Sequence, residues 1–316
     1  MLHRLKCIDY SSLPISEYSR QYIQRMLPHL DYYLDIYHRC LDKMLRQIDK
    51  KPADIVMVDY GGGHGFLSLT AKQMGIGKVI YIDINPQAAE TVQALANEVG
   101  ITPDSILQGD ASTLRQWCSD NRITPDALLG MDVIEHIYRL EVFFADIYAA
   151  NPTIFMLFTT GSTPYNPFVK RRLHRIMRAD ELGHGGQPGF FLLRKQHILR
   201  HYPEMKDWEA ELWAADTRGL TYPDILVAVD THRPHTDIDD YNTCDPATGS
   251  WTERILPIAA YQALVRPYHA TVSVGLGYYN THRAGLKGIA SRLTNLLLHI
   301  PISRPLAPFI TLIIKK

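Results

Sequence analysis

The sequence predicts an α/β domain whose central sheet is mostly parallel and is covered by helices on both faces. Between residues 55 and 159, short apolar runs of strand length alternate with helical patterns. A glycine-rich turn follows the first of these runs, and two further strand patterns occur near the C-terminus. Alternation of this kind is typical of βαβ units, which place parallel strands between layers of helices.

The five alternating strands are expected at 55–60, 78–83, 105–108, 127–131 and 153–159. Helical patterns separate them at 66–74, 86–99, 112–121 and 136–149. Asn85 and Pro86 open the second helix with a capping residue and a proline at the first helical position. Gly100 ends that helix.

The remaining segments divide the chain into four parts. Residues 1–52 form an N-terminal helical segment with a break near Pro28, and 53–161 form the core. From 162 to 266 the alternation stops and loop signals appear, which predicts an inserted lid or substrate region. Residues 267–316 complete the sheet, with a strand at 269–279, a helix at 284–299 and a strand at 309–315.

Composition narrows the class of protein. Of the 316 residues, 46% are apolar, and Lys plus Arg and Asp plus Glu both number 33, so charge balance gives no reason to expect a nucleic-acid partner. The start lacks the apolar stretch of a signal peptide, and the apolar run 306–314 is too short for a transmembrane helix. Four scattered cysteines fit a reducing compartment, so we expect a cytoplasmic location.

The glycine turn carries the most information about function. It has the spacing D-x-G-x-G-x-G, from Asp59 through Gly61 and Gly63 to Gly65. Glycines between a strand and a helix let the backbone approach a ligand at the carboxyl edge of a sheet. Dinucleotide folds need G-x-G-x-x-G, but the third glycine position counted from Gly61 is occupied by Phe66.

The turn resembles the first motif of class I S-adenosylmethionine-dependent methyltransferases, and matching residues follow in order. Asp83 ends the second strand, where a carboxylate accepts hydrogen bonds from ribose hydroxyls, and Ile84 would flank the adenine. Gly109-Asp110-Ala111 resembles the family's third-strand step at the adenine edge. The run from Asp132 to His136 (DVIEH) is similar to a signature of small-molecule methyltransferases of ubiquinone and menaquinone biosynthesis.

The resemblance implies a Rossmann-like seven-stranded sheet that ends on two antiparallel strands and binds S-adenosylmethionine. It implies a cofactor site made by residues at the ends of four strands: Asp59, Gly61, Gly63, Gly65, Asp83, Ile84, Asp110, Ala111 and Asp132. A structural interpretation stands beside it, in which Asp59 and Asp83 only cap the turns that follow them.

His136 is the candidate general base, because it follows the fourth strand and an imidazole accepts a proton near neutral pH. A helix-starting or packing role is the alternative. Asp132, Glu135 and His136, with His184, could instead hold a divalent metal, although our preferred site contains none. His64 is expected beside the cofactor rather than as a base. The basic run from Lys170 to Arg178 could bind an anion or form a solvated helix face.

The expected function is methyl transfer by in-line displacement to a small-molecule acceptor. The sequence lacks the Asn-Pro-Pro-Tyr type of tetrapeptide and any Pro-Cys dipeptide, which disfavours adenine-N6 and cytosine-C5 methylation. Two other functions remain open, an NAD-dependent Rossmann oxidoreductase and a catalytically silent cofactor-fold protein. The acceptor, its target atom and the oligomeric state are not indicated.

Overall fold

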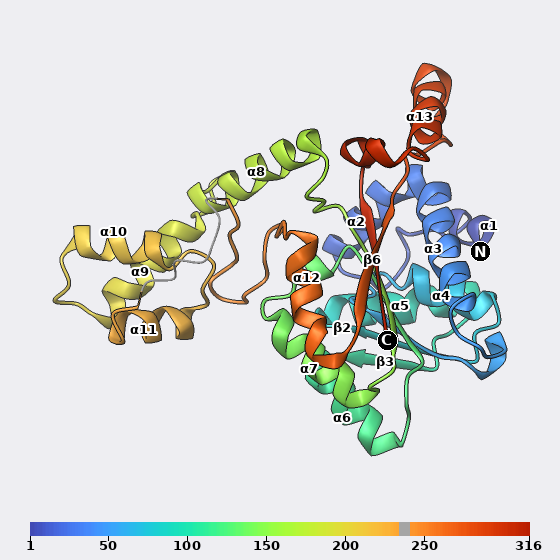
Figure 1. Cartoon of the computed structure of the whole chain (residues 1–316), viewed down its shortest axis with the longest axis horizontal. Helices are drawn as coiled ribbons and strands as arrows, with labels where there is room; N and C mark the ends of the chain where they lie inside the picture. Colours follow the sequence, from blue (N-terminus) through green and yellow to red (C-terminus); the bar gives the residue numbers. More distant parts are fainter. Residues whose placement is uncertain (234–240) are drawn as a thin grey trace. The chain divides into compact units, whose positions relative to one another are not determined.

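The computed structural model describes residues 1–233 and 241–316 and contains a seven-stranded sheet within these ranges (Figure 1). The strand order is β3-β2-β1-β4-β5-β7-β6. The strands are β1 Val56–Tyr60, β2 Lys78–Asp83, β3 Ser105–Gln108, β4 Ala127–Met131, β5 Phe155–Thr160, β6 Thr271–Leu276 and β7 Ile310–Lys315.

Strand direction brings the ends of several strands to one edge of the sheet. β1 to β5 pair in parallel, and β7 is antiparallel to both β5 and β6. β6 therefore runs in the same direction as β5. The carboxyl ends of β1 to β6 lie at one edge, which we call the carboxyl edge. The carboxyl end of β7 lies at the opposite edge. The sequence prediction of a mostly parallel sheet with two antiparallel pairings at its end is confirmed.

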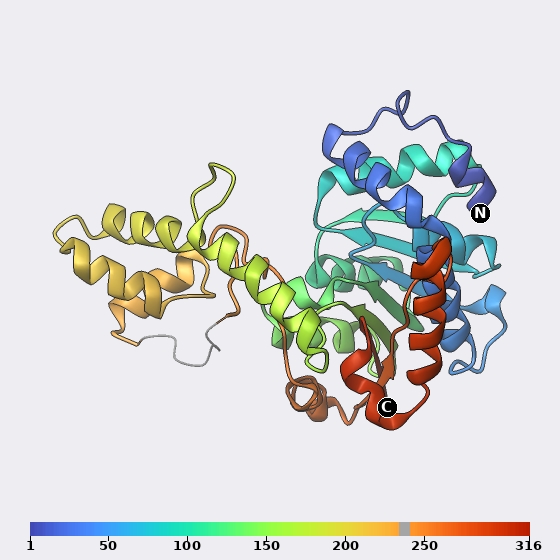
Figure 2. The same cartoon turned by 90° about the horizontal axis from the view of Figure 1, so that it is seen from above.

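Helices cover both faces of this sheet. The N-terminal helices pack with α4 and α5 over one face, where Leu41, Leu67 and Leu95 join Met57 and Leu157 in a single buried core (Figure 2). On the other face, the ring of Phe143 in α7 lies 6.0 Å from that of Phe158 in β5. The helices of this part are α1 Leu2–Lys6, α2 Glu17–Met26, α3 Leu30–Leu45, α4 Phe66–Gln73, α5 Pro86–Val99, α6 Ala111–Asn121, α7 Leu140–Ala150, α12 Ile258–Val265 and α13 Gly285–Leu297.

Two sequence predictions differ from the structure. The helix expected at 136–149 begins at Leu140, because residues 134–136 form a separate 3-10 turn. The segment 162–266 was expected to be rich in loops, but much of it is helical. Its helices are α8 Pro167–Leu182, α9 Phe190–His201, α10 Asp207–Asp216, α11 Tyr222–Asp230 and α12. No helix among the described residues is both long and apolar enough to cross a membrane.

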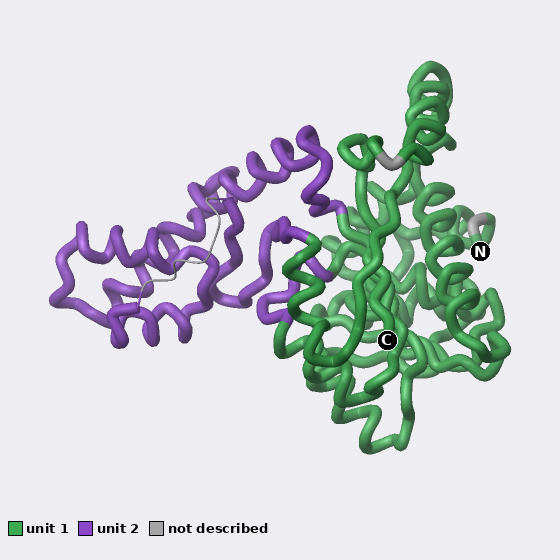
Figure 3. The backbone as a smooth tube through the Cα atoms, viewed as in Figure 1, with its two compact units in different colours: residues 1–133, 141–160, 258–316 green, residues 134–140, 161–257 purple. Residues whose placement is uncertain are grey.

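The described chain forms two compact units (Figure 3). Unit 1 contains the sheet and comprises residues 1–133, 141–160 and 258–316, and unit 2 comprises 134–140 and 161–257. Unit 2 has its own small apolar core, in which Ile198 of α9, Ala210 of α10 and Ile225 of α11 are fully buried.

A buried ion pair joins the helices of unit 2. The Arg194 side chain has no exposed surface, and its Nη2 donates to Glu181 Oε1 at 2.5 Å while its Nε donates to the Ala214 carbonyl. Thr243 Oγ1 donates to the other carboxylate oxygen of Glu181 at 2.7 Å. Burial raises the pKa of Glu181, but the hydrogen bonds and charge of Arg194 outweigh it and hold that pKa below its ordinary value. The pair is therefore ionised and satisfied.

In unit 1, the junction between β1 and α4 depends on a buried carboxylate. Asp59 is 1% exposed, and its Oδ2 accepts hydrogen bonds from the backbone N–H of Ser68 at 2.9 Å and from Ser68 Oγ at 2.6 Å. The carboxylate thus caps the first turn of α4. Burial raises the pKa of Asp59 to about 7, because the two bonds from Ser68 only partly compensate for lost hydration.

We predict that truncating one partner of the buried pair destabilises unit 2. Arg194→Ala leaves Glu181 ionised and without its main partner, which costs about 3–5 kcal/mol in the free energy of unfolding. Chemical denaturation monitored by tryptophan fluorescence measures this loss. Arg200→Ala, at an exposed site of the same helix, serves as the matched control and is expected to leave the midpoint unchanged. Equal stability of the two variants would contradict a central role for the pair.

A second prediction concerns pH. Since the folded-state pKa of Asp59 is about 7 and its ordinary value is 3.8, the folded protein holds a proton that the unfolded chain releases between these values. Stability from this group therefore falls by roughly 1.4 kcal/mol per pH unit as pH rises from 4 to 7. Asp59→Asn keeps an acceptor for Ser68 and cannot ionise. We expect it to match the wild type near pH 4 and to melt at a higher temperature at pH 8; a constant difference across this range would contradict the prediction.

Candidate functional site

The glycine turn lies at the carboxyl edge of the sheet, between β1 and α4. Gly61, Gly63 and Gly65 all have positive φ, at 64°, 52° and 75°, a conformation that side chains disfavour. A Cβ on Gly61 would lie 2.3 Å from Val133 Cγ2, and one on Gly65 would lie 2.0 Å from Val92 Cγ2. A Cβ on Gly63 would have no atom within 4 Å. Gly61 and Gly65 thus leave no room for a larger side chain. Gly63 has open space where its Cβ would be, so a ligand can approach its backbone.

Asp83, at the end of β2, holds this turn in place. Its Oδ2 accepts a hydrogen bond from the Gly63 N–H at 2.9 Å, and its Oδ1 accepts one from the Asn85 N–H at 2.8 Å. Tyr81 on the same strand donates its hydroxyl to the Gly63 carbonyl at 2.6 Å. Ile84 follows with a 74% exposed apolar side chain. A carboxylate, an open backbone turn and an exposed apolar side chain therefore lie close together.

The end of β3 contributes Asp110 and Ala111. Asp110 caps α6, because its Oδ1 accepts from the backbone N–H groups of Ser112 and Thr113 at 3.0 and 3.1 Å. Burial raises its pKa, but these hydrogen bonds outweigh it and lower the pKa overall. Burial raises the pKa of Tyr60, and the charge of Asp110 raises it further. The charge of Asp110 therefore reaches Tyr60 of β1. Ala111, the residue after Asp110, is buried.

Asp132 follows β4 with a strained backbone. Its φ is 49°, and its N–H donates to the Thr159 carbonyl of β5 at 3.0 Å. Few residues other than glycine adopt this conformation, although Asp does so more readily than most. The side chain is exposed. The bond to β5 therefore fixes the backbone of Asp132 at the end of β4. This places Asp132 at the carboxyl edge of the sheet, where the glycine turn also lies.

The charge of Asp132 acts on four tyrosines of the N-terminal helices, Tyr32 and three others. Burial raises the pKa values of Tyr22, Tyr33 and Tyr37, and the negative charge of Asp132 raises each of them further. The imidazole of His64 stacks on the Tyr22 ring, with centroids 4.6 Å apart and planes at 21°. We call Tyr22, Tyr33 and Tyr37 the tyrosine wall. Sequence reasoning missed it, although Tyr18 with Tyr22 and Tyr33 with Tyr37 show i, i+4 spacing on successive helices.

His64 is a poor candidate for a base. Its side chain is 9% exposed, and burial lowers its pKa to about 4. An imidazole with this pKa is neutral across the physiological range and is a weak proton acceptor. This agrees with a packing role against Tyr22.

His136 belongs to unit 2, in the 3-10 turn that follows β4 in sequence. Its Nδ1 lies 2.7 Å from the Trp251 carbonyl oxygen, and the Trp251 N–H donates to the carbonyl of His136. Because a carbonyl only accepts, Nδ1 carries the proton and the lone pair of neutral His136 is on Nε2. His184 pairs with Asp180 at 3.0 Å. Among the described residues, no three His, Cys, Asp or Glu side chains form a group that could hold a metal ion.

The basic run from Lys170 to Arg178 lies on α8 of unit 2. Leu173 and Met177 are its buried positions, whereas Lys170, Arg171, Arg172, Arg175 and Arg178 are exposed. The pattern is that of an amphipathic helix with a solvated basic face.

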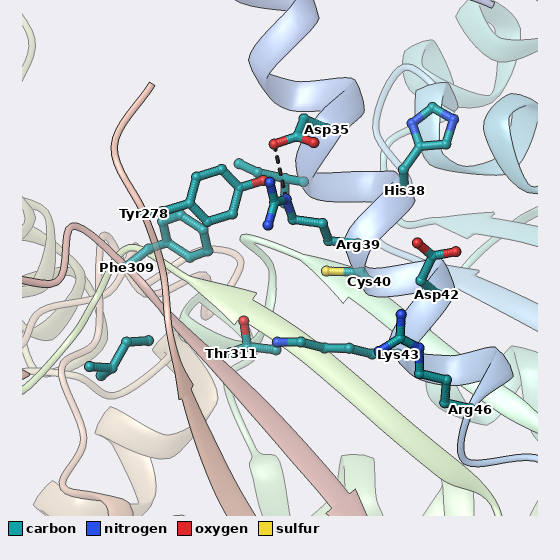
Figure 4. Close-up of a pocket in the computed structure, with 12 residues that line it drawn as sticks. Asp35, His38, Arg39, Cys40, Asp42, Lys43, Arg46, Tyr278, Phe309 and Thr311 are labelled. Atoms are coloured by element: carbon teal, nitrogen blue, oxygen red, sulfur yellow. Dashed lines mark hydrogen bonds and ion pairs between the residues drawn. The ribbon is translucent and has the colours of Figure 1, made fainter. Parts of the chain in front are cut away.

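A cavity of about 500 Å³ lies between α3 and the strands β6 and β7 of unit 1 (Figure 4). Arg39 in its wall bonds to Asp35 and lies 4.6 Å from the Tyr278 ring centroid. Lys43 extends across the cavity toward Thr311 in the close-up. Burial raises the pKa of Cys40, another lining residue, to about 12, and Asp132 contributes to this rise.

Comparison with known proteins agrees with this geometry. Residues 58–150 match the model of a family described as a methyltransferase domain. The chain is 36% identical over 63 residues to a ribosomal protein L11 methyltransferase of Dechloromonas aromatica, covering 20% of each protein. It is 32% identical over 78 residues to the same enzyme of Bordetella parapertussis, covering 23% of this chain and 24% of that protein. The chain thus matches only about a fifth to a quarter of the length of these curated relatives.

The search of solved structures found proteins with lower sequence identity. A SAM-dependent methyltransferase from Archaeoglobus fulgidus is 12% identical, with a TM-score of 0.44 over 89% of this chain and 94% of that one. An S-adenosylmethionine-dependent methyltransferase from Mesorhizobium loti is 13% identical, with a TM-score of 0.42 over 86% and 95%. Residues 58–150 are thus similar to a methyltransferase domain, and they span β1 to β4 of the seven-stranded sheet together with the helices between them.

Proposed function

We propose that the protein transfers a methyl group from S-adenosylmethionine to a small-molecule acceptor by in-line displacement. The observation that carries the proposal is the pairing of an open glycine turn with the Asp83 carboxylate at the carboxyl edge of the sheet. Residues 53–161 and 267–316 would form the cofactor domain. Residues 1–52 and the insertion 162–266 would select the acceptor.

The residues at the turn fit the cofactor. Gly63 leaves its backbone open where a Cβ would project into space, so a ligand can approach there. Asp83 has a half-buried carboxylate that can also accept hydrogen bonds from a ribose, and exposed Ile84 offers an apolar surface to an adenine. Ala111 and Asp110 would contact the adenine edge. Asp59 would act from behind the turn, because its carboxylate already caps α4.

The methyl group and its sulfonium leaving group are supplied by the cofactor, so the chain mainly orients the reactants. Correct orientation is worth roughly 7–11 kcal/mol of a barrier. The tyrosine wall and Asp132 would form one side of the space in which the acceptor is held. Aromatic faces favour cationic groups and flat rings, and Asp132 adds a negative charge.

The cavity between α3 and β6–β7 would receive the rest of the acceptor. It is of the size of ordinary small-molecule sites. Its lining combines apolar side chains such as Leu276 and Phe309 with six acidic or basic ones, which are Asp35, His38, Arg39, Asp42, Lys43 and Arg46. This composition fits an organic acceptor that combines an apolar part with several polar or charged groups.

We assign His136 as the general base for an acceptor that loses a proton. The bond from Nδ1 to the Trp251 carbonyl fixes the ring and leaves Nε2 to accept that proton. His136 lies five residues after the end of β4 in sequence. The same bond would also hold residues 134–136 against 251, so the proposal is tested against a purely structural role below.

The run from Asp132 to His136 (DVIEH) supports a small-molecule acceptor, because it resembles a signature of methyltransferases of quinone biosynthesis. The relatives with a protein acceptor, the ribosomal protein L11 methyltransferases, match about a fifth of this chain. A match of that length does not transfer an acceptor to the remaining four fifths. The small-molecule acceptor is therefore the function that we put forward.

Asp83→Ala is expected to weaken S-adenosylmethionine binding by about 1.5–3 kcal/mol, the scale for hydrogen bonds to a charged group. The loss has two sources, the missing ribose acceptor and the released Gly63 N–H. Isothermal titration calorimetry with S-adenosylmethionine and S-adenosylhomocysteine measures it. Glu98→Ala, which removes an exposed carboxylate from α5, is the matched control. Unchanged affinity in a folded Asp83→Ala protein would remove Asp83 from the site.

His136→Ala is expected to reduce turnover by roughly 10²–10⁴-fold and to leave cofactor affinity nearly intact. The assay follows labelled methyl groups from the cofactor into an organic-solvent extract of cells as the acceptor pool. The acidic limb of the rate–pH profile should disappear in the variant.

The control for this variant is His184→Ala, because His184 is an exposed histidine of the same unit. A structural role for His136 predicts a lower melting temperature with activity lost only in proportion. A folded His136→Ala protein with near-normal turnover would exclude the base and favour an acceptor that needs no deprotonation, such as a neutral amine.

A further inference from the structure

Helix α13 exposes apolar side chains, whereas the two residues that it buries are small. Gly288 and Ser291 are buried, and Asn295 docks the helix through two bonds to the backbone of Tyr279, at 2.7 and 2.9 Å. A Cβ on Gly288 would lie 2.0 Å from the Arg283 carbonyl, so Gly288 packs closely against the segment that leads into the helix. A helix of a globular protein normally buries its apolar face. In α13 the polarity is inverted.

Exposed apolar side chains recur along α13 and in the segment that follows it. Leu286 is 84% exposed and Ile302 is 86% exposed. The surface, which we call the α13 stripe, consists of Leu286, Ile289, Leu293, Leu296, Leu297, Ile300 and Ile302. At 3.6 residues per turn, the members from 286 to 297 share one side of the helix, and Ile300 and Ile302 follow its end. Exposed apolar surface of this kind marks an interaction site.

Basic residues border the α13 stripe. Lys287 and Arg292 are exposed, and helical spacing places them on opposite sides of the stripe. None of the acidic residues of the chain occurs after Glu253, although Lys and Arg continue to the C-terminus. A neutral protein thus concentrates positive charge in the segment that carries the apolar stripe.

We propose that α13 is a docking surface for an anionic membrane, on which the helix lies parallel to the lipid surface. An apolar stripe bordered by Lys and Arg is the pattern that inserts into the boundary between headgroups and acyl chains. Each basic residue near an anionic surface adds about 1 kcal/mol, and the missing acids remove repulsion from the lipid. Two copies of the chain would bring Lys287 and Arg292 against like charges, which disfavours a dimer through this face.

The place of α13 in unit 1 connects docking with the catalytic edge. The helix follows β6, whose end lies at the carboxyl edge with the glycine turn and Asp132. Figure 1 shows α13 extending beyond the end of β6 and the start of β7. A membrane contacted by the stripe would therefore lie on the side of unit 1 at which the proposed site opens. The docking itself does not depend on the proposed methyl transfer.

The test is co-sedimentation of the full chain with vesicles. The wild type should bind phosphatidylcholine vesicles that contain about a third phosphatidylserine at least tenfold more strongly than pure phosphatidylcholine vesicles, and added salt should reduce this binding. Leu286→Ser with Leu293→Ser should lower binding to the anionic vesicles by tenfold or more. Lys287→Gln with Arg292→Gln should abolish the preference for phosphatidylserine.

The matched control is Phe168→Ser with Val227→Ser, which removes two exposed apolar side chains from unit 2 and should leave binding unchanged. All variants change exposed side chains, and melting temperatures verify that they fold.

Three results would overturn the proposal. The first is no binding of the wild type to either kind of vesicle. The second is vesicle binding that the leucine variant retains and the basic variant loses, because a surface that binds a polyanion such as a nucleic acid would behave in this way. The third is a dimer in sedimentation velocity that the leucine variant abolishes. Each result is independent of cofactor binding, so failure here is distinguishable from failure of the proposed function.

Discussion

The site depends on the bond between the Asp59 carboxylate and Ser68. This carboxylate is taken out of water at the end of β1 and receives two hydrogen bonds from the start of α4. The bonds fix the angle at which the chain leaves the sheet, and the glycines between them absorb the reversal with positive φ. A looser junction would let the Gly63 backbone rotate away from Asp83. The cost is a carboxyl whose pKa is raised to about 7 by burial.

The proposed acceptor side is organised around a second strained residue, Asp132. Its positive φ directs the chain out of β4, and its charge raises the pKa values of Tyr22, Tyr33 and Tyr37, of which Tyr37 is buried and Tyr22 is exposed. Tyrosine rings tolerate a neighbouring carboxylate because they remain neutral, and burial already raises their pKa values. The result is a surface that is aromatic and negative, opposite in character to the basic border of α13. These two surfaces lie on the same unit and suggest different partners, an acceptor group and a lipid headgroup.

Much of the fold could be predicted from the sequence because its strands are marked by local signals. Ile55 to Tyr60 and Lys78 to Asp83 are apolar runs followed by turn residues, and the observed strands agree with them to within about a residue. The helix break before Leu140 was missed, since residues 134–136 turn to bond with 251 and 254, far away in sequence. The helices of 162–230 were hidden by loop-forming residues such as Gly183 and Gly189, which in the structure end α8 and begin α9.

The sequence by itself determined the positions of Asp59, Gly61, Gly63, Gly65, Asp83 and Asp110, because each is tied to a strand end by short-range geometry. Only the tertiary structure decided what surrounds them. The tyrosine wall comes from helices that precede β1 by about 20 to 40 residues, and its approach to Asp132 depends on the packing of α3 over the sheet. The inverted polarity of α13 was equally hidden, because periodicity shows that a helix has an apolar face but not which way that face points.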